Sequence, residues 1–228
     1  MNLTTQHQQP RCILVQIINL VFLVAASAGL GEAAEPPARQ GSLIAGATSG
    51  FDGSMSRAQL DSYVSRAATM VGLVNGAGNL DDHIRMITNT GMKYAGRSVS
   101  FWTQHPSLQE STIPAALPKL KANADRIHAA APDLILEGCS FEIVTKSVGD
   151  VAVPAWVFAE FGKPVVDRKF NYADIVGRWG VDHWGKDTCI PDIMKEEYQM
   201  WVYYLARNWI DVGCEAVHFG EMVTLCRS

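Results

Sequence analysis

The sequence has 228 residues, of which 48% are hydrophobic and 18% are charged, and its formal net charge is −4. This composition excludes a disordered or collagen-like chain and is typical of an ordinary globular protein. Lys and Arg number 19 against 23 Asp and Glu, and they form no run along the chain, so a protein that binds nucleic acid through its phosphates is not expected.

The first 34 residues have the layout of a secretory signal peptide. Residues 1–11 are polar, residues 13–30 are largely apolar, and Ala26-Ser27-Ala28 forms an A-x-A cleavage site. The alternative is an uncleaved membrane anchor, because the apolar stretch is just long enough to span a bilayer. The cleavage site favours the signal peptide, which residues 35–41 follow as a linker. The sequence therefore predicts an exported protein, periplasmic or secreted. Attachment to a membrane is expected only if the N-terminal segment stays uncleaved.

Export changes what the cysteines are expected to do. Cys12 leaves with the signal peptide, and the four that remain allow three disulfide pairings, among which the sequence does not choose. Cys139 and Cys214 lie in apolar strand-like runs, which is typical of small buried residues. Cys189 and Cys226 lie in loop or terminal contexts and are the better disulfide candidates.

Helix-like and strand-like segments alternate through residues 42–228, which we expect to form one domain. Asn79 is expected to cap one of the helices, and Gly91 to end it. The alternation predicts βαβ units and a parallel sheet. Helices are expected over residues 57–71, 79–91, 116–131, 153–161 and 193–212, and strands or short apolar runs over residues 42–48, 93–102, 133–144, 164–167 and 215–225.

The parallel sheet could be doubly wound or part of a (β/α) barrel. Gly76-Ala77-Gly78 precedes a helix but lacks the third glycine of a dinucleotide-binding loop, so we interpret it as a turn and expect no cofactor. A complete barrel has eight strands and about 250 residues. The expected fold is therefore mixed α/β, a partial (β/α) barrel with about four or five parallel strands.

Two glutamates near strand ends are the candidate catalytic residues. Glu142 lies near the end of the strand over residues 133–144, and Glu221 lies in the strand over residues 215–225. Two carboxylates that converge at a barrel mouth are what glycoside hydrolysis requires, one as an acid and one as a nucleophile or base. The alternative is that Glu142 caps a helix or pairs with an arginine, and that Glu221 is an ordinary loop carboxylate.

Strand alternation predicts which way Glu142 points. Gly138 and Ser140 share its face, and we expect this face to line the barrel interior. The opposite face is expected to pack under helices, and it carries Cys139, Phe141 and Ile143.

Residues 170–187 are rich in aromatic side chains and are expected to form a long loop near the barrel mouth. Aromatic faces bind the apolar side of a sugar ring, and a carboxylate binds its hydroxyls. The alternative is a small aromatic core beneath the loop. No metal is expected, because the acidic, histidine and cysteine residues here lack the spacing of a zinc site. The substrate-binding candidates are Trp102, His105, Trp179, Asp182, Trp184 and His218.

The strand ends SVSFW, CSFEIV and AVHFGEMV, alternating with helices, resemble the glycoside-hydrolase type of TIM barrel over residues 42–225. The usual Asn-Glu pair at a strand end is missing, so the resemblance is architectural. It implies an exported hydrolase that acts on carbohydrate, with Glu142 and Glu221 as the paired carboxylates. The alternative is a non-catalytic carbohydrate-binding or interaction module, or an inactive, truncated barrel.

The last expected strand, residues 215–225, is followed by only three residues that could cover it. Its apolar side chains would leave a patch in water that monomers rarely tolerate. We therefore expect self-association through this open C-terminal edge. The other expected partner is a carbohydrate or another small polar ligand. The side chains of the patch are Val217, Phe219, Val223 and Leu225.

Overall fold

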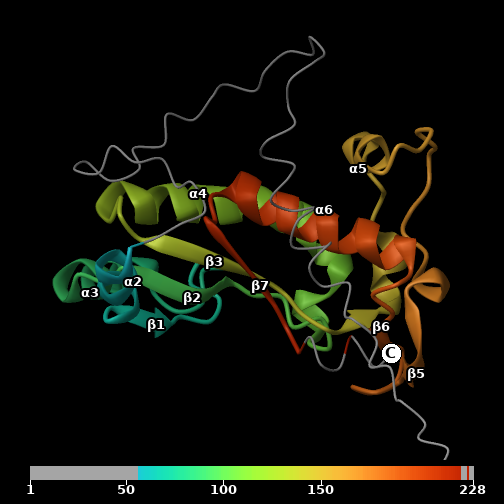
Figure 1. The fold of residues 1–228 in the computed structure, drawn as a ribbon, viewed down its shortest axis with the longest axis horizontal. Helices are drawn as coiled ribbons and strands as arrows, with labels where there is room; N and C mark the ends of the chain where they lie inside the picture. The colour runs from blue at the N-terminus through green and yellow to red at the C-terminus, as the bar shows by residue number, and fades with distance from the viewer. Residues whose placement is uncertain (1–55, 222–224, 226–228) are drawn as a thin grey trace, which may run out of the picture. The chain divides into compact units, whose positions relative to one another are not determined.

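Four parallel strands form the main sheet of the computed structural model, which describes residues 56–221 and Leu225 (Figure 1). Their order in the sheet follows the chain, β1-β2-β3-β7, and every neighbouring pair is parallel. The expected mixed α/β class with a parallel sheet is confirmed, and the four described strands do not close into a barrel. The strands are β1 (Ala67–Thr69), β2 (Tyr94–Val99), β3 (Ile135–Ser140) and β7 (Ala216–Phe219).

Local signals set several helix boundaries. The side chain of Asn79 accepts hydrogen bonds from the backbone N–H groups of Asp81 and Asp82, and Gly91 ends this helix in the left-handed conformation, as expected. The helix Glu196–Val212 likewise ends at Gly213, which is also left-handed. The helices are α2 (Arg57–Val64), α3 (Leu80–Thr90), α4 (Ile113–Ala130), α5 (Ala155–Glu160) and α6 (Glu196–Val212). Within the described residues, none of these helices is long and apolar enough to cross a membrane.

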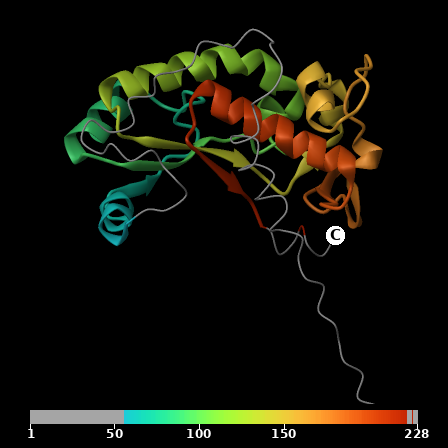
Figure 2. The ribbon, with the colours of Figure 1, turned by 45° about the horizontal axis from the view of Figure 1, so that its top comes forward.

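Helices α4 and α6 lie together over one face of the parallel sheet (Figures 1 and 2). Trp209 of α6 is completely buried there, and its indole N–H donates a hydrogen bond to the Cys139 carbonyl at 2.9 Å. A Cβ built at Gly138 would lie 2.6 Å from Cβ of Trp209. Gly138 therefore faces α6, and its missing side chain allows the tryptophan to approach the strand.

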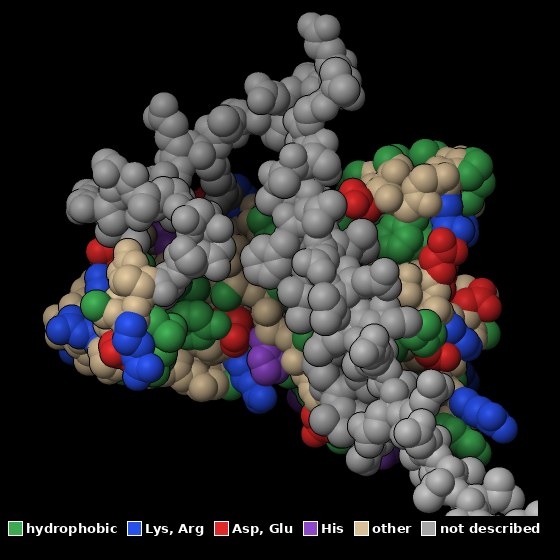
Figure 3. All heavy atoms as spheres, viewed as in Figure 1, with side chains coloured by type: hydrophobic (Ala, Val, Ile, Leu, Met, Phe, Trp, Pro, Cys, Tyr) green, Lys and Arg blue, Asp and Glu red, His purple; other side chains and the backbone are tan. Residues whose placement is uncertain are grey.

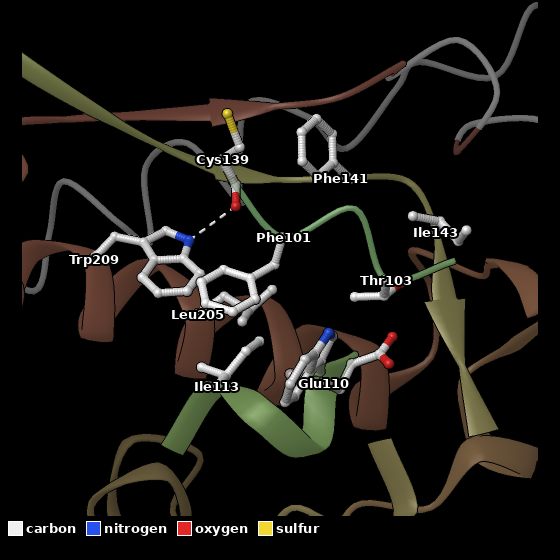
Figure 4. A pocket seen from close by; sticks show the side chains of 10 residues that line it. Phe101, Thr103, Glu110, Ile113, Cys139, Phe141, Ile143, Leu205 and Trp209 are labelled. Atoms are coloured by element: carbon white, nitrogen blue, oxygen red, sulfur yellow. Dashed lines mark hydrogen bonds between the residues drawn. The ribbon is translucent and has the colours of Figure 1, made fainter. Parts of the chain in front are cut away.

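The predicted orientation of β3 is wrong. Because Gly138 faces α6, the alternating positions Cys139 and Phe141 point away from the helices, as Figure 4 shows. The physical reason is the volume of Trp209, which fits only where a strand residue has no side chain. Glu137 lies on the same face as Cys139 and Phe141, which is the face that α4 and α6 do not cover.

A second sheet has three antiparallel strands, and its strand β5 lies within residues 170–187, where a long aromatic loop was expected. Its order is β4-β6-β5, with β4 at Val144–Thr145, β5 at Val176–Val181 and β6 at Thr188–Pro191. Short 3-10 turns complete the described chain: η1 (Pro106–Leu108), η2 (Glu110–Thr112), η3 (Lys146–Asp150) and η4 (Tyr172–Asp174).

Two further element predictions are wrong. The helix expected over residues 57–71 ends at Val64, because Ala67–Thr69 pairs with β2 as a strand. Residues 164–167 form no strand. In the first place, pairing with the distant segment β2 outweighs the local helical pattern.

The cysteine contexts are also revised. Cys189 was expected in a loop and as a disulfide candidate, but it lies in β6, completely buried and with a free thiol. Cys139 and Cys214 are buried with free thiols, as expected. The predictions for the signal peptide of residues 1–34, the linker of residues 35–41, the run at 42–48 and Cys226 fall outside the described residues.

Strand β7 pairs with β3 on one side and has no neighbouring strand on the other among the described residues. Val217 and Phe219 are half-buried. Leu225, expected to be exposed, is only 3% exposed. The apolar patch is therefore smaller than expected at this residue, and self-association through the edge stays a prediction.

Candidate functional site

The parallel strands bring the two candidate glutamates to one edge of the sheet. β3 ends at Ser140 and β7, its neighbour, at Phe219, and Ser140 pairs with Phe219 in the register. Residues that follow the carboxyl ends of adjacent parallel strands lie side by side, which is where α/β proteins place ligands. Glu142 and Glu221 therefore share this edge.

Glu142 is buried at this edge, against the backbone of Gly220. Its side chain is only 4% exposed, and a Cβ built at Gly220 would overlap its Oε2 atom. Burial raises the pKa of Glu142, and the negative charge of Glu221 raises it further, whereas the charges of His218 and Arg97 oppose this rise. The charges of Glu221, His218 and Arg97 therefore all act on Glu142 at this edge.

Glu137 accepts hydrogen bonds from two residues of β2 on the face of the sheet opposite α6. Tyr94 donates its hydroxyl hydrogen to Oε1 of Glu137 at 2.7 Å, and the backbone N–H of Arg97 donates to Oε2 at 2.8 Å. Nδ1 of His218 lies 4.0 Å from Oε1. This hydrogen bonding, together with burial, raises the pKa of Tyr94 strongly, burial being the larger cause. The sequence analysis missed Glu137, although a lone carboxylate in an apolar strand is a signal of such a role.

Arg97 interrupts the regular pairing of β2 with β3. The register shifts between Ala95 and Val99, and Arg97 has a φ of 56°, in the left-handed region. Its guanidinium carbon lies 5.9 Å from the centre of the Phe141 ring, and the residue is exposed. The bulge therefore directs a cation to the same edge as the two glutamates.

Aromatic side chains line this edge. Trp102, just after β2, makes edge-to-face contacts with Phe141 at 5.3 Å and with Trp184 at 5.4 Å between ring centres. Trp184 comes from the turn between β5 and β6, and Gln104 donates a side-chain hydrogen bond to its carbonyl. Phe141 also contacts His218, with ring centres 6.5 Å apart. The structure thus brings Trp102, Trp184 and His218 together around Phe141.

The other three predicted residues have local roles. His105 caps η1, where its Nδ1 accepts a hydrogen bond from the backbone of Ser107. Asp182 lies in the turn after β5 and accepts a hydrogen bond from the Asp187 N–H at 2.8 Å. Trp179 is 73% exposed in β5. Of the three, His105 stays next to the edge, because its backbone N–H donates a hydrogen bond to the Trp102 carbonyl at 2.9 Å.

A separate pocket lies on the helix side of the sheet, between β3, α4 and α6 (Figure 4). Phe101, Ile113 and Trp209 line it, and it has room for about one water molecule. Its charged group, Glu110, is fully buried and accepts three hydrogen bonds, from Thr145 N–H and from the hydroxyl groups of Thr145 and Ser147. Such a pocket is too small for a sugar ring, and Glu110 has a structural role.

Histidine, basic and acidic side chains lie next to one another over the parallel sheet near β7 (Figure 3). Among the described residues, no three His, Cys, Asp or Glu side chains are placed to hold a metal ion.

Comparison of this chain with protein-family models, with curated proteins and with solved structures found no match.

Proposed function

We propose that this chain is a glycoside-hydrolase-like protein whose parallel sheet is a segment of a (β/α) barrel. The strand order β1-β2-β3-β7 follows the chain without the reversal of a doubly wound sheet, and α4 and α6 lie on the same face. The opposite face carries polar groups, and the candidate site lies at the carboxyl ends of the strands, where barrel enzymes have their active sites.

The chemistry follows from the different surroundings of the two glutamates. Glu142 is buried and its pKa is raised, so it is suited to donate a proton to the oxygen of the leaving group. Glu221, on the neighbouring strand, is the second carboxylate, which attacks the anomeric carbon or activates a water. Trp102 and Trp184 provide aromatic surface for a sugar ring at the same edge.

The observation that carries this proposal is that Glu142 lies against Gly220, the residue before Glu221, and that the charge of Glu221 acts on it. The test is release of reducing sugar from a panel of polysaccharides. We expect Glu142→Gln and Glu221→Gln each to lower turnover by 100-fold or more, roughly the size of a general acid or base contribution. The matched control is Glu196→Gln, because Glu196 is exposed on α6 and pairs with Lys163. Equal turnover by all variants would refute the assignment.

Gly220→Ala tests the geometry independently. The added methyl group overlaps only the end of the flexible Glu142 side chain, so the carboxylate moves while the fold remains. A displacement of about 1 Å can lower the rate about 100-fold. An unchanged rate in a folded Gly220→Ala variant would show that the Glu142 carboxylate does not need this position.

The second candidate function is non-catalytic carbohydrate binding, which the exposure of Trp179 favours. This indole is 73% exposed, and Arg178 lies over its ring with its guanidinium carbon 5.0 Å from the centre. An exposed tryptophan face is a stacking surface for sugars. Binding without turnover, lost in Trp179→Ala and retained in Glu142→Gln, would support this function in place of hydrolysis.

Export is part of the proposed function and rests on residues 1–34. N-terminal sequencing of the protein from the culture medium or periplasm tests it. We expect a chain that begins near Gly29 or Ala34, and an intact Met1 on membrane-bound protein would contradict a cleaved signal peptide.

A further inference from the structure

A hydroxyl group on the pocket of Figure 4 has no hydrogen-bond partner. Thr103 follows β2 and is 5% exposed, and its Oγ1 atom is buried and unpaired within the described part of the chain. A buried hydroxyl group without a partner costs free energy, so most such groups in proteins are paired with protein atoms or with ordered water. The Thr103 hydroxyl group therefore points to a ligand that the pocket can hold.

Glu110 lines the same pocket and can accept one more hydrogen bond. Oε2 of its fully buried carboxylate accepts from the hydroxyl groups of Thr145 and Ser147, both at 2.5 Å. Among the described residues, Oε1 accepts only from the Thr145 N–H, at 2.7 Å. A carboxylate oxygen accepts about two hydrogen bonds, so Oε1 has a position left for a donor.

The size and the lining of the pocket select the ligand. The pocket has room for about one water molecule, and Thr103 and Glu110 both line it, next to each other in Figure 4. The remaining side chains around it are mostly apolar and buried, among them Phe101, Ile113 and Leu205. An internal water molecule makes about two to four hydrogen bonds, and Thr103 and Glu110 supply a donor and an acceptor for it. An apolar ligand would leave the Thr103 hydroxyl group unpaired.

We propose that this pocket binds one internal water molecule, which accepts a hydrogen bond from the Thr103 hydroxyl group and donates one to Oε1 of Glu110. Because Glu110 also accepts from Thr145 of β4, the water connects the end of the parallel strand β2 to the second sheet. The proposal does not depend on the proposed function, because the pocket is lined by neither Glu142 nor Glu221.

A crystal structure of the full chain tests the site directly, and we expect one ordered water within hydrogen-bond distance of Thr103 Oγ1 and Glu110 Oε1. Magnetic relaxation dispersion of the water oxygen nucleus tests it in solution, because this measurement counts the long-lived internal waters of a protein. The variant is Thr103→Val, which replaces the hydroxyl group by a methyl group of similar size, whereas Thr103→Ser keeps the hydroxyl group. The matched control is Thr112→Val, because the Thr112 hydroxyl group donates directly to the Gln109 carbonyl at 2.7 Å and does not line the pocket.

We expect Thr103→Val to hold one long-lived water fewer than the unmodified protein, and its Tm to fall by about 2–4 °C, because a hydrogen-bonded link is lost. Thr103→Ser and Thr112→Val should keep the number of waters. An unchanged number of waters in Thr103→Val would overturn the proposal, and so would a rise in its Tm, which removal of an unpaired buried hydroxyl group would give. A crystal structure that resolves ordered waters elsewhere but none between Thr103 and Glu110 would overturn it as well.

Discussion

The close approach of α6 to β3 makes Gly138→Ala the most informative single change in the core. The new methyl carbon would lie 2.6 Å from Cβ, 2.7 Å from Cγ and 2.8 Å from Cδ1 of Trp209. Carbon atoms in contact are about 3.5–4.0 Å apart, so about 1 Å of separation must be found. Trp209 has little freedom to move, because it is completely buried, stacks on Phe101 at 5.7 Å and donates a hydrogen bond to Cys139.

The expected cost follows from these contacts. Overpacking of a core costs about 1–3 kcal/mol, and the lower backbone entropy of alanine in the unfolded chain returns about 0.5–1 kcal/mol. The backbone of β3 or the axis of α6 must shift as well, so we place the net destabilisation at about 2 kcal/mol. For a chain of this size that corresponds to a fall in Tm of about 4–8 °C.

Thermal unfolding followed by circular dichroism measures this change. The control is Gly149→Ala, because a Cβ there would meet nothing closer than the Phe170 carbonyl at 3.9 Å, and its Tm should change by no more than about 2 °C. A Gly138→Ala variant as stable as the Gly149→Ala variant would refute the packing of α6 against this face, and with it the orientation of Glu137 on the other face.

Three further outcomes are expected. Glu142→Gln should raise Tm at pH 7, because burial raises the pKa of Glu142 above 4.5, so that ionisation of this carboxyl group destabilises the fold. Calorimetry should show that the difference in Tm between the variant and the unmodified protein vanishes below pH 4.5. The pairing of His128 with Glu215, 3.2 Å away, raises the pKa of the histidine above 6.5. The pair should therefore stabilise the fold fully below pH 6.5, and this stabilisation should be lost as the pH rises through the pKa of His128 in the folded protein. A series of denaturation curves that shows the same loss in His128→Gln would contradict this. Glu110→Ala should lower the free energy of unfolding by about 3 kcal/mol or more, because the buried Thr145 N–H loses its acceptor, and a urea titration would refute this if the midpoint were unchanged.

Local sequence signals were enough for part of the fold. Asn79 and Gly91 bound α3 because capping depends on a few adjacent residues. The apolar stretches within residues 93–102, 133–144 and 215–225 each contain a strand of the parallel sheet. Because the carboxyl ends of parallel strands meet at one edge, the position of Glu142 and Glu221 at that edge could also be predicted from the chain.

The environment of those glutamates depends on residues far apart in the sequence. The face of β3 that meets the helices was predicted the wrong way round, because alternation gives two faces and only the packing of Trp209 on Gly138 chooses between them. The expected aromatic loop is a hairpin, because β5 and β6 pair with each other and β6 pairs with β4.

The sequence by itself therefore determined the type of the main elements, several of their ends and the strand-end position of Glu142 and Glu221, because these depend on neighbouring residues and on the period of the chain. Only the tertiary structure decided that Tyr94, Glu137 and Arg97 form one polar group beside them. Their hydrogen bonds join β2 to β3 across 40 and 43 residues of chain and require a register shift, which no periodic pattern in the sequence encodes.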